Sequence, residues 1–561
     1  MLAATRSQRA RAASNTGEQA LLVLRKSGWM NTPVDARSEA VCRAAALADD
    51  TYGPVNEAEG RLTIDAATAQ RLVLAIGTEE PPPLSDADDF FSCRARNAAG
   101  RACEAARVIM RCAKHGACDS AHVLLEAGFV PAAVGAYQRS VSVALSDETP
   151  PFVRIEAFKL ASRAAMALES LASGVRQNRP ETNDAFQTTR ADVCGEYATL
   201  GVLETVSTVL ASKLSDSPML ASLRINTLVL ADTTFLGLRD LSGVEASLVR
   251  DIGSYVGDSD GQVASLALLT LYSIAVMQNE VTEASKSLTD AALEAFCEPT
   301  LIEAIAHAIS RGRVVAGGFI IEMLAAKALS HAHAFAKPSV VGALLKVISL
   351  DSDETRTAYE KQDKYVSSTR GQSHTGFVAA GSDNPWVRHD RKIDELSAVA
   401  LLAILKTGAV AASPKLGAAI IVPILDKLRA SFVDPTPGPE LYEIRRVCLE
   451  ILETLAPLHA KAIIEAGGVD VAIDLLKQLK LPGSTATRRL TEMAARNPCA
   501  FLEPLIKARP AYADAVRLEL KEFTDQPEFL TFMEYAPEFL LDWLWPELEN
   551  APGGPPEFML D

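Results

Sequence analysis

Apolar positions recur along this chain with a helical spacing, in helix-length runs separated by short polar links. The clearest unit runs from Gly243 to Asn279. There an amphipathic run ends near Val256, and a Gly/Asp/Ser link separates it from an almost wholly apolar run, Gln262 to Met277. Neither helix could bury its apolar surface alone. The pattern therefore predicts a helical unit that stacks on further copies of itself.

The same pairing returns through most of the sequence. A short helix broken by Gly128 precedes a second helix, and the arrangement repeats around Gly201. Prolines at Pro150, Pro151 and Pro218 open long third helices, because a proline at the first helical turn gives up no hydrogen bond. The shortest spacings between units are close to forty residues, which is typical of stacked helical repeats. The predicted second-helix starts lie near Ile64, Phe129, Val202, Val244, Thr300, Ser339, Ala418 and Val469.

Three stretches carry a resemblance to a known family. Glu126–Val134 (EAGFVPAAV) and Glu465–Leu476 (EAGGVDVAIDLL) look like a short helix, a glycine turn and a second helix, and Gln262–Ala275 looks like a third helix. In these stretches the chain resembles the armadillo-repeat family, over roughly Ile64 to Leu479. The resemblance implies an all-α, right-handed superhelix (an α-solenoid of armadillo/HEAT-like repeats) whose third helices line a concave binding groove. We expect about seven or eight such units, with insertions.

The chain departs from the peptide-binding members of that family. Many of them carry an asparagine near the end of each third helix, which holds the backbone of the ligand. The groove tryptophans of nuclear-import receptors also have no counterpart here, so an extended peptide held in that manner is not expected. The residues at the asparagine positions are Ser170, Asp232, Ser273, His331 and Thr454.

Composition agrees with a helical array. Hydrophobic residues make up 48% of the 561 residues and aromatic residues only 6%, with Ala and Leu dominant, which favours close helix packing over sheets. No run alternates convincingly as a strand would. A chain of this length exceeds one hydrophobic core. We expect a basic tail with leading helices over residues 1–60, a solenoid over 61–500 with a polar insertion at 351–390, capping helices over 501–550 and a flexible tail over 551–561.

Charge, hydropathy and cysteine content indicate which partners and which cellular compartment suit this chain. The net charge of −16 argues against wholesale binding to nucleic acid or to an anionic membrane surface. The most apolar run, Gln262–Met277, contains Ser265 and Thr270 and is expected to be a buried repeat helix, so no integral membrane segment is predicted. Nine scattered cysteines without a CxxC pair indicate buried free thiols in a reducing compartment.

A cytoplasmic location is therefore the expectation. The first 17 residues carry three arginines and no acid, a composition that also suits an organellar transit peptide. A disordered basic tail explains the same residues.

The sequence patterns that could indicate catalysis or metal binding are weak. Gly257–Gly261 (GDSDG) fits the GxSxG pattern of a hydrolase nucleophile, but that chemistry needs a strand before the serine and a helix precedes it here. A helix–helix link explains the same residues. His331 and His333 point to different faces of a helix, and His307 precedes them on a neighbouring one. A C-x2-H-x2-C-x3-H pattern could bind zinc, although small cysteines also pack well between helices. Its members are Cys112, His115, Cys118 and His122. We predict no metal, no cofactor and no enzymatic activity.

Polar groups on the predicted third helices are the main candidates for binding. Lys159 and Arg163 are four residues apart and face alike, with Arg154 loosely aligned. A basic strip inside an acidic protein would select an acidic segment. The alternative is ordinary solvation with pairing to local acids such as Glu156 and Glu443. The candidate residues of the concave face are Arg154, Lys159, Arg163, Arg224, Asn226, His331, Arg445 and Arg446.

Two other segments could anchor a partner. The polar insertion Asp351–Asp390 contains Phe377 and Trp386, although a long surface loop is the simpler interpretation. The last forty residues are acidic and aromatic and repeat the phrase PEF[LM], with Trp543, Trp545 and Phe558 as candidate anchors. Acids interleaved with aromatic residues suit docking to a basic groove. The alternative is that residues 523–548 cap the last repeat.

The function that these observations favour is non-catalytic. We expect a scaffold or adaptor that binds another protein along the concave face through a few anchor residues. The alternative is a structural component of a larger cytoskeletal (ciliary) or chaperone-associated assembly, attached through the insertion and the C-terminal tail. An enzyme that uses the solenoid as a support is a third hypothesis.

Overall fold

The structure is a computed structural model of the chain. It describes residues 55–58, 61–77, 86–111, 119–174, 190–212, 214, 217–279, 286–327, 332–350, 393–410, 413–431, 439–477, 501–512 and 516. These residues divide into two compact units, with the division between Phe296 and Cys297.

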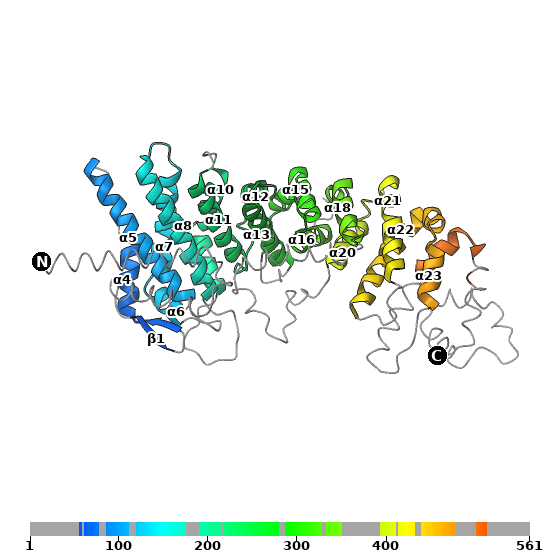
Figure 1. Cartoon of the computed structure of the whole chain (residues 1–561), viewed down its shortest axis with the longest axis horizontal. Helices are drawn as coiled ribbons and strands as arrows, with labels where there is room; N and C mark the ends of the chain where they lie inside the picture. Colours follow the sequence, from blue (N-terminus) through cyan, green and yellow to red (C-terminus); the bar gives the residue numbers. More distant parts are fainter. Residues whose placement is uncertain are drawn as a thin grey trace. The chain divides into compact units, whose positions relative to one another are not determined.

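Unit 1 consists of helical repeats that follow one another in chain order. Its third helices α5, α8, α11 and α13 pack each on the next, and its second helices α4, α7, α10 and α12 do the same (Figure 1). The third helices are α5 (Asp86–Arg111), α8 (Pro151–Gly174), α11 (Pro218–Phe235) and α13 (Gly261–Asn279). The second helices are α4 (Ala66–Ile76), α7 (Phe129–Leu145), α10 (Val202–Ala211) and α12 (Ala246–Ser254). The short first helices are α6 (Asp119–Glu126), α9 (Arg190–Thr199) and α14 (Asp290–Phe296).

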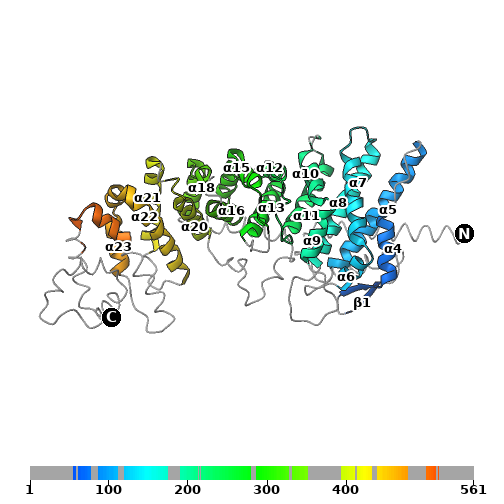
Figure 2. The ribbon, with the colours of Figure 1, turned by 180° about the vertical axis from the view of Figure 1, so that it is seen from behind.

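Unit 2 repeats this plan. Its third helices α16, α20 and α22 pack in succession, as do its second helices α15, α18, α21 and α23 (Figure 2). The third helices are α16 (Val314–Lys327), α20 (Ile393–Lys406) and α22 (Pro439–Glu465), with the short α17 (Ala332–Phe335) after α16. The second helices are α15 (Pro299–Ser310), α18 (Pro338–Ile348), α21 (Pro414–Ala430) and α23 (Gly468–Lys477). A further helix covers residues 501–508.

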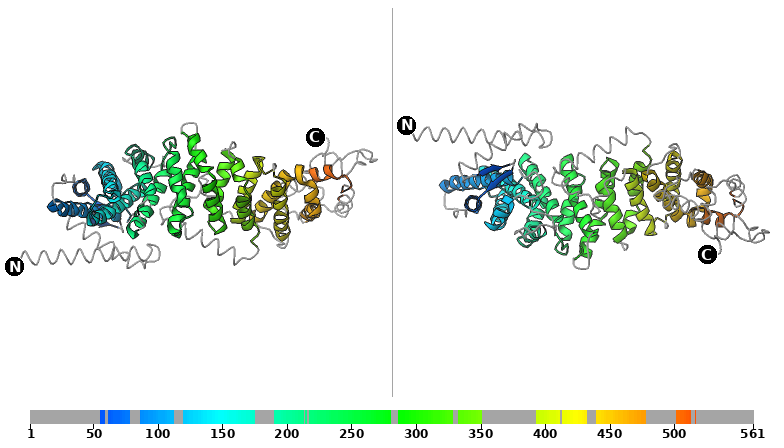
Figure 3. Two further views of the ribbon diagram at one scale, coloured as in Figure 1. Left: turned by 90° about the horizontal axis from the view of Figure 1, so that it is seen from above. Right: turned by 90° about the horizontal axis from the view of Figure 1, so that it is seen from below.

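A short β-hairpin, which the sequence pattern does not predict, directly precedes helix α4. Strands β1 (Val55–Ala58) and β2 (Arg61–Ile64) pair antiparallel, with Val55 opposite Ile64. Figure 3 shows the hairpin beside the N-terminal helices of unit 1, where β2 contacts α5 and α6. Strands of four residues are too short for the alternation of apolar residues to register as a pattern.

The predicted fold class is confirmed, since each unit is built of armadillo/HEAT-like helical repeats that stack in chain order. All eight predicted second-helix starts fall within a few residues of an observed second helix, and Phe129 and Val202 coincide with the first residues of α7 and α10. The first helix α14 has no counterpart among the predicted elements. The structure does not test the predicted domain boundaries.

The glycine turns adopt the conformation that their position requires. Gly128, Gly201 and Gly467 have φ of 84°, 81° and 81°, the left-handed region that side chains with a Cβ avoid. Gly128 and Gly201 each lie between a short helix and the second helix that follows, and Gly467 lies between the end of α22 and the second helix α23. The sequence prediction of glycine breaks at Gly128 and Gly201 is therefore confirmed.

Polar side chains connect neighbouring repeats at two of these turns, those of Gly201 and Gly467. The Nε2 of Gln138 on α7 donates to the carbonyl of Leu200, 2.6 Å away and directly before Gly201. In unit 2, the Nη2 of Arg429 on α21 donates to the carbonyl of Ala466, also 2.6 Å away and directly before Gly467. Carbonyl groups at a helix end have no partner within the helix, so each contact satisfies an otherwise unpaired acceptor.

The third helix α13 is the core of unit 1. Every residue from Val263 to Val276 is buried. Among the described residues, α13 is the one helix long and apolar enough to cross a membrane, but 83% of its apolar window is buried inside the protein. The prediction of a buried repeat helix is confirmed. Its hydroxyls are satisfied locally, since the Oγ1 of Thr270 donates to the carbonyl of Leu266, 2.8 Å away.

Helix α22 breaks at His459, where the backbone leaves the helical region two residues after Pro457. Proline in a helix interior removes one hydrogen bond and displaces the preceding turn. The His459 side chain is buried and packs directly on Gly417 of α21. A Cβ at position 417 would lie 2.2 Å from its Nε2. Glycine at position 417 therefore leaves the space that the His459 side chain of the kinked helix occupies.

We predict that Gly417→Ala lowers the stability of unit 2. The added methyl group collides with a buried ring, and overpacking of this kind costs about 1–3 kcal/mol. The shift in the urea-denaturation midpoint measures this cost.

Gly342→Ala on α18 is the matched control, because a Cβ there meets no atom within 4 Å. It should stabilise by about 0.5–1 kcal/mol, since alanine loses less conformational entropy than glycine in a helix. In a His459→Ala background the cost of Gly417→Ala should shrink. Equal effects of the two glycine replacements would contradict the collision.

Candidate interaction surface

An exposed stripe runs along the third helix α8 of unit 1. Phe152 and Ile155 are 52% and 38% exposed, which is unusual for large apolar residues in a fold that buries most of them. Lys159, one turn further on, is also exposed, and Arg163 is half-buried. Residues at this spacing share one face of a helix. We call Phe152, Ile155, Lys159 and Arg163 the α8 stripe.

The neighbouring third helix extends this face. On α11, Ser222 is exposed and Asn226 and Val229 are half-buried, again at the spacing of one helix face. Because α8 and α11 pack side by side, the two stripes are adjacent. Among the described residues of α8 and α11 that reach solvent, Glu156 is the one acid.

The cations of the α8 stripe differ in their contacts. The Nζ of Lys159 lies 2.7 Å from the Oε1 of Glu156, one turn earlier on the same helix. An exposed pair at this spacing contributes well under 1 kcal/mol, so a partner can displace it at little cost. The guanidinium of Arg163 lies against Gly100 of α5, where an added Cβ would be 2.9 Å from its Nη1.

Three of the predicted binding arginines instead close the corner between a second helix and the following third helix. Each donates from its Nη2 to the carbonyl of the serine that ends the second helix. Arg154 reaches Ser146 after α7 at 2.7 Å, and Arg224 reaches Ser212 after α10 at 3.0 Å. In unit 2, Arg445 reaches Ser431 after α21 through both its backbone carbonyl and its hydroxyl.

The corner arginines are held by more than these bonds. Arg224 is buried and its guanidinium lies over the ring of Tyr255, 5.2 Å from the ring centre. The Tyr255 hydroxyl in turn donates to the carbonyl of Leu210, 2.7 Å away near the same helix end. Arg445 is buried as well. Contacts within the protein thus account for the positions of these arginines. That a partner also binds them remains a prediction.

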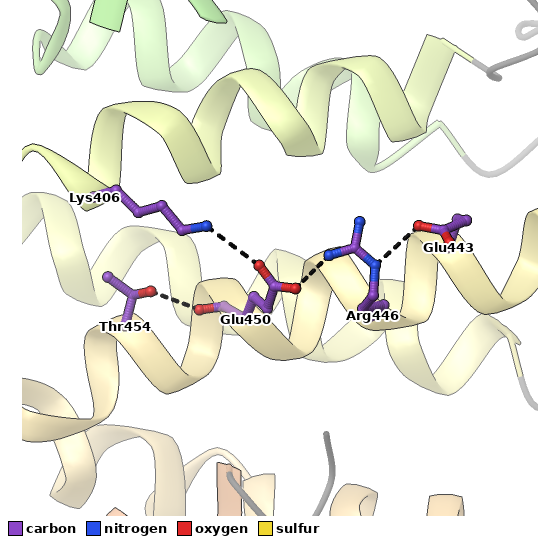
Figure 4. Close-up of polar contacts among 5 residues, drawn as sticks. All are labelled: Lys406, Glu443, Arg446, Glu450 and Thr454. Carbon is purple, nitrogen blue, oxygen red and sulfur yellow. Dashed lines mark hydrogen bonds and ion pairs between the residues drawn. The ribbon is translucent and has the colours of Figure 1, made fainter. Parts of the chain in front are cut away.

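The corresponding face of unit 2 carries a network of charges. Figure 4 shows Arg446 of α22 between Glu443 and Glu450, with Lys406 of α20 reaching Glu450 from the neighbouring helix. The Nε of Arg446 is 2.9 Å from Glu443, and the Nζ of Lys406 is 3.4 Å from Glu450. The Thr454 hydroxyl donates to the backbone carbonyl of Glu450 at 2.7 Å. Both cations are therefore engaged by carboxylates.

This network sets the protonation of Arg446. Partial burial disfavours the charged guanidinium, but the hydrogen bonds and charges of Glu443 and Glu450 outweigh that effect and raise the pKa of Arg446. Lys159 thus pairs with Glu156, and Arg446 pairs with Glu443. Pairing to local acids was the alternative to partner binding at these basic residues.

The positions that hold asparagine in peptide-binding relatives differ in their environment. Ser170, Asp232 and Ser273 are buried between helices. The Ser273 hydroxyl of α13 donates to the Asp232 carboxylate of α11, so this pair joins adjacent third helices. Thr454 is exposed. Because these three side chains are buried, they cannot hold the backbone of a bound peptide as the asparagines do in peptide-binding relatives.

Several predicted anchors lie outside the described residues. These are His331, Phe377, Trp386, Trp543, Trp545 and Phe558, together with the basic segment 1–17 and Cys112, His115 and Cys118 of the cysteine–histidine pattern. Attachment through the insertion and the tail, and the cytoplasmic location, stay predictions. Asn226 is described and half-buried on α11, while His307 and His333 are exposed on separate helices.

The GDSDG segment is a link between two helices, as predicted by the alternative to a hydrolase nucleophile. It joins α12 to α13, and no strand precedes it. The Asp260 carboxylate accepts from the backbone N–H of Gln262, 2.8 Å away, and so caps the start of α13. Ser259 is exposed. Within the described ranges no group of three or more His, Cys, Asp or Glu is arranged to hold a metal ion, and His122 is buried in α6.

The described cysteines form no disulfide, and all of them are buried. Burial raises the pKa of the Cys103 and Cys448 thiols to about 12 and that of Cys194 to about 11, because the charged thiolate is poorly solvated there. A thiol with such a pKa is neutral at physiological pH and behaves as a small hydrophobe. For the described cysteines, the prediction of buried free thiols is confirmed.

Phe152 and Ile155 are not among the residues predicted from the sequence to bind a partner. Both belong to the run PFVRI at the start of α8, where apolar residues read as part of the core. The signal that could have identified them is their helical spacing to Lys159, which places them on the solvent face rather than the buried one.

Comparison with known proteins gives no family. No protein-family model and no curated protein sequence matches this chain. Among solved structures, the chain is similar to the crystal complex of SYS-1/POP-1, with 12% identity, a TM-score of 0.46, and coverage of 91% of this chain and 85% of that one. It is also similar to an engineered protein, with 14% identity, a TM-score of 0.25, and coverage of 64% of this chain and 96% of that one.

We predict that Arg445→Met destabilises unit 2 by about 1.5–3 kcal/mol, since the Ser431 carbonyl and hydroxyl oxygens lose their charged donor, although the hydroxyl still donates to the Leu428 carbonyl. Arg446→Met removes a neighbouring, more exposed arginine and should cost about 1 kcal/mol or less. Urea-denaturation midpoints of the two variants compare the effects directly. An equal loss in both would argue against a distinct corner role.

We also predict that Cys103, Cys194 and Cys448 resist alkylation in the folded protein at pH 8. A thiol with a pKa near 12 is about one ten-thousandth thiolate at that pH. Iodoacetamide labelling followed by peptide mass spectrometry measures the reaction at each site. The same cysteines should label fully in urea, which serves as the control. Rapid labelling of the native protein would show that these thiols are accessible.

Proposed function

We propose that this protein is a non-catalytic scaffold that binds another protein through the third-helix face of unit 1. The observation that carries the proposal is the α8 stripe, which exposes Phe152 and Ile155 next to Lys159. Large apolar residues held on a rigid helix are typical centres of protein interfaces, where a few side chains supply most of the affinity.

The chemistry of the stripe indicates the kind of partner. Lys159 and Arg163 add positive charge beside the two apolar residues, although the chain as a whole has a net charge of −16. A segment with apolar side chains flanked by Asp or Glu would complement this face. Burying one large apolar side chain contributes about 1.5–3 kcal/mol, so Phe152 and Ile155 together could supply most of the affinity of a modest complex.

The face of unit 2 is less suited to an acidic segment. Lys406 and Arg446 are already paired with Glu450 and Glu443. A carboxylate arriving there would have to displace existing partners and would meet nearby acids of like charge. We therefore place the main contact of the proposed partner on unit 1.

The test begins with affinity purification of the full chain from its native cells and mass spectrometry to identify candidate partners. Binding of a purified candidate is then compared between the native chain and the double variant Phe152→Ser, Ile155→Ser. We expect the double variant to weaken the complex by about thirtyfold or more, since central anchors of this kind are worth at least 2 kcal/mol.

Lys159→Glu should weaken binding by about tenfold at low salt and by less at high salt, because exposed charges are screened. Leu74→Ser on α4 is the matched control, since Leu74 is 71% exposed but belongs to a second helix and is not part of the stripe. Unaltered binding in the double variant, or an equal loss in the Leu74 control, would rule out the α8 stripe as the contact surface.

A further inference from the structure

The last stretch of the chain, residues 522–561, has a composition that complements the α8 stripe. It lies outside the described residues. Its sequence contains ten acids and no Lys or Arg, so it carries more than half of the net charge of −16, and eight aromatic residues are interleaved with these acids. The stripe combines exposed apolar side chains with cations, whereas this segment combines apolar side chains with carboxylates. The two are therefore complementary in charge and in hydrophobicity.

The phrase PEF[LM] occurs three times in this segment, and its third copy, residues 556–559, suits docking best. Glu557 and Asp561 there flank three consecutive apolar residues. Five of residues 552–561 are proline or glycine, which disfavour helices, so the sequence predicts a flexible tail there. The two earlier copies belong to residues 523–548, for which capping of the last repeat is the alternative.

The dimensions of the two surfaces agree. A five-residue run such as Glu557–Asp561 (EFMLD) covers about 13 Å when its backbone is fully extended. From Phe152 to Arg163 the stripe is about 16 Å long at the helical rise per residue. The run can therefore place Phe558 on the apolar part of the stripe and still bring a carboxylate to its cations. The existing ion pair of Lys159 is exposed, so a carboxylate of the run can replace it at little cost.

Two other segments outside the described residues fit the stripe less well. The insertion Asp351–Asp390 has seven acids but also five Lys or Arg, so its own cations would approach Lys159 and Arg163. The segment 1–17 has three arginines and no acid, so it would be repelled. Charge therefore favours the acidic segment over both.

We propose that the run Glu557–Asp561 of one copy of this chain docks on the α8 stripe of a second copy. Phe558 covers Phe152 and Ile155, and the flanking carboxylates pair with the cations of the stripe. This inference rests on the proposed function, because it uses the same surface. The two contacting surfaces differ, so the copies associate head to tail. Self-association then occupies the stripe and competes with any other protein that binds there.

A fluorescein-labelled peptide of residues 552–561, titrated with the full chain, tests the contact by fluorescence anisotropy. We expect saturable binding with a Kd below about 1 mM. The double variant Phe152→Ser, Ile155→Ser should weaken it by about thirtyfold or more, while the Leu74→Ser control should bind as the native chain does. No saturation up to about 1 mM, or equal binding by the double variant, would overturn the proposal.

Variants of the peptide separate its apolar and charged contacts. Phe558→Ser should weaken binding by at least about tenfold, since the large apolar side chain is lost. Glu557→Gln combined with Asp561→Asn should weaken binding by about threefold or more at low salt and by less at high salt. Native-like binding of the Phe558 peptide would overturn the proposal. Native-like binding of the neutralised peptide would contradict the charge complementarity on which the choice of segment depends.

Full-length variants test whether the contact joins two copies. Analytical ultracentrifugation of the native chain should show association that increases with concentration. Phe558→Ser and the double variant Phe152→Ser, Ile155→Ser should each remain monomeric, with unchanged helical circular-dichroism spectra. Their equimolar mixture should associate again, since one supplies the intact stripe and the other the intact run. A mixture that stays monomeric, or a native chain that stays monomeric above the Kd of the peptide, would overturn the proposal.

The results also distinguish this inference from the proposed function. A chain that binds a different protein through the α8 stripe but does not bind the peptide contradicts the self-association alone. A double variant that loses the peptide but binds the different protein as the native chain does contradicts the proposed function alone.

Discussion

The structure depends above all on third helices that bury one another. In unit 1, α8 and α11 each have a third helix on both sides, and α13 is buried along its length from Val263 to Val276. The first helices are only seven to ten residues long and would be marginal alone in water. Their stability must come from the packing of neighbours. In the described repeats, this packing of helix on helix holds the surface side chains in place.

Polar groups within this apolar packing are paired across repeats. The Tyr137 hydroxyl of α7 lies 3.0 Å from the Thr227 hydroxyl of α11, and Tyr197 of α9 donates to the carbonyl of Leu168 in α8 at 2.8 Å. The pair of Asp232 and Ser273 joins α11 to α13. A buried polar group is costly unless it is hydrogen-bonded, so these contacts also favour one alignment of neighbouring helices over others.

Arginine has two different roles in this protein. At the helix corners, Arg154, Arg224 and Arg445 satisfy carbonyl groups that the end of a helix leaves unpaired. On the α8 stripe, Arg163 accompanies exposed apolar side chains instead. The unit 2 face differs again, since its cations are paired with carboxylates. Counting basic residues on third helices therefore overestimates the positive surface that a partner would meet.

The sequence by itself determined the helical class, the order of the helices and the glycine turns. Helical spacing, prolines at helix starts and the left-handed requirement at Gly128 and Gly201 are local properties, so they can be read without knowing the neighbours. The helix–helix nature of the GDSDG link follows for the same reason. The hairpin β1–β2 and the short helix α14 were not predicted, because such brief elements show too little periodicity of apolar residues.

Only the tertiary structure decided which polar side chains meet a neighbour and which meet solvent. Helical periodicity places Arg154 and Lys159 on related faces, but it cannot show that a serine carbonyl lies beside Arg154 and the Glu156 carboxylate beside Lys159. The same holds for Ser273, whose partner is 41 residues away in sequence. In α13 all faces are apolar, so no stripe distinguishes its sides. The exposure of Phe152 likewise depends on what the adjacent repeat covers, and that is a property of the packed array rather than of the local sequence.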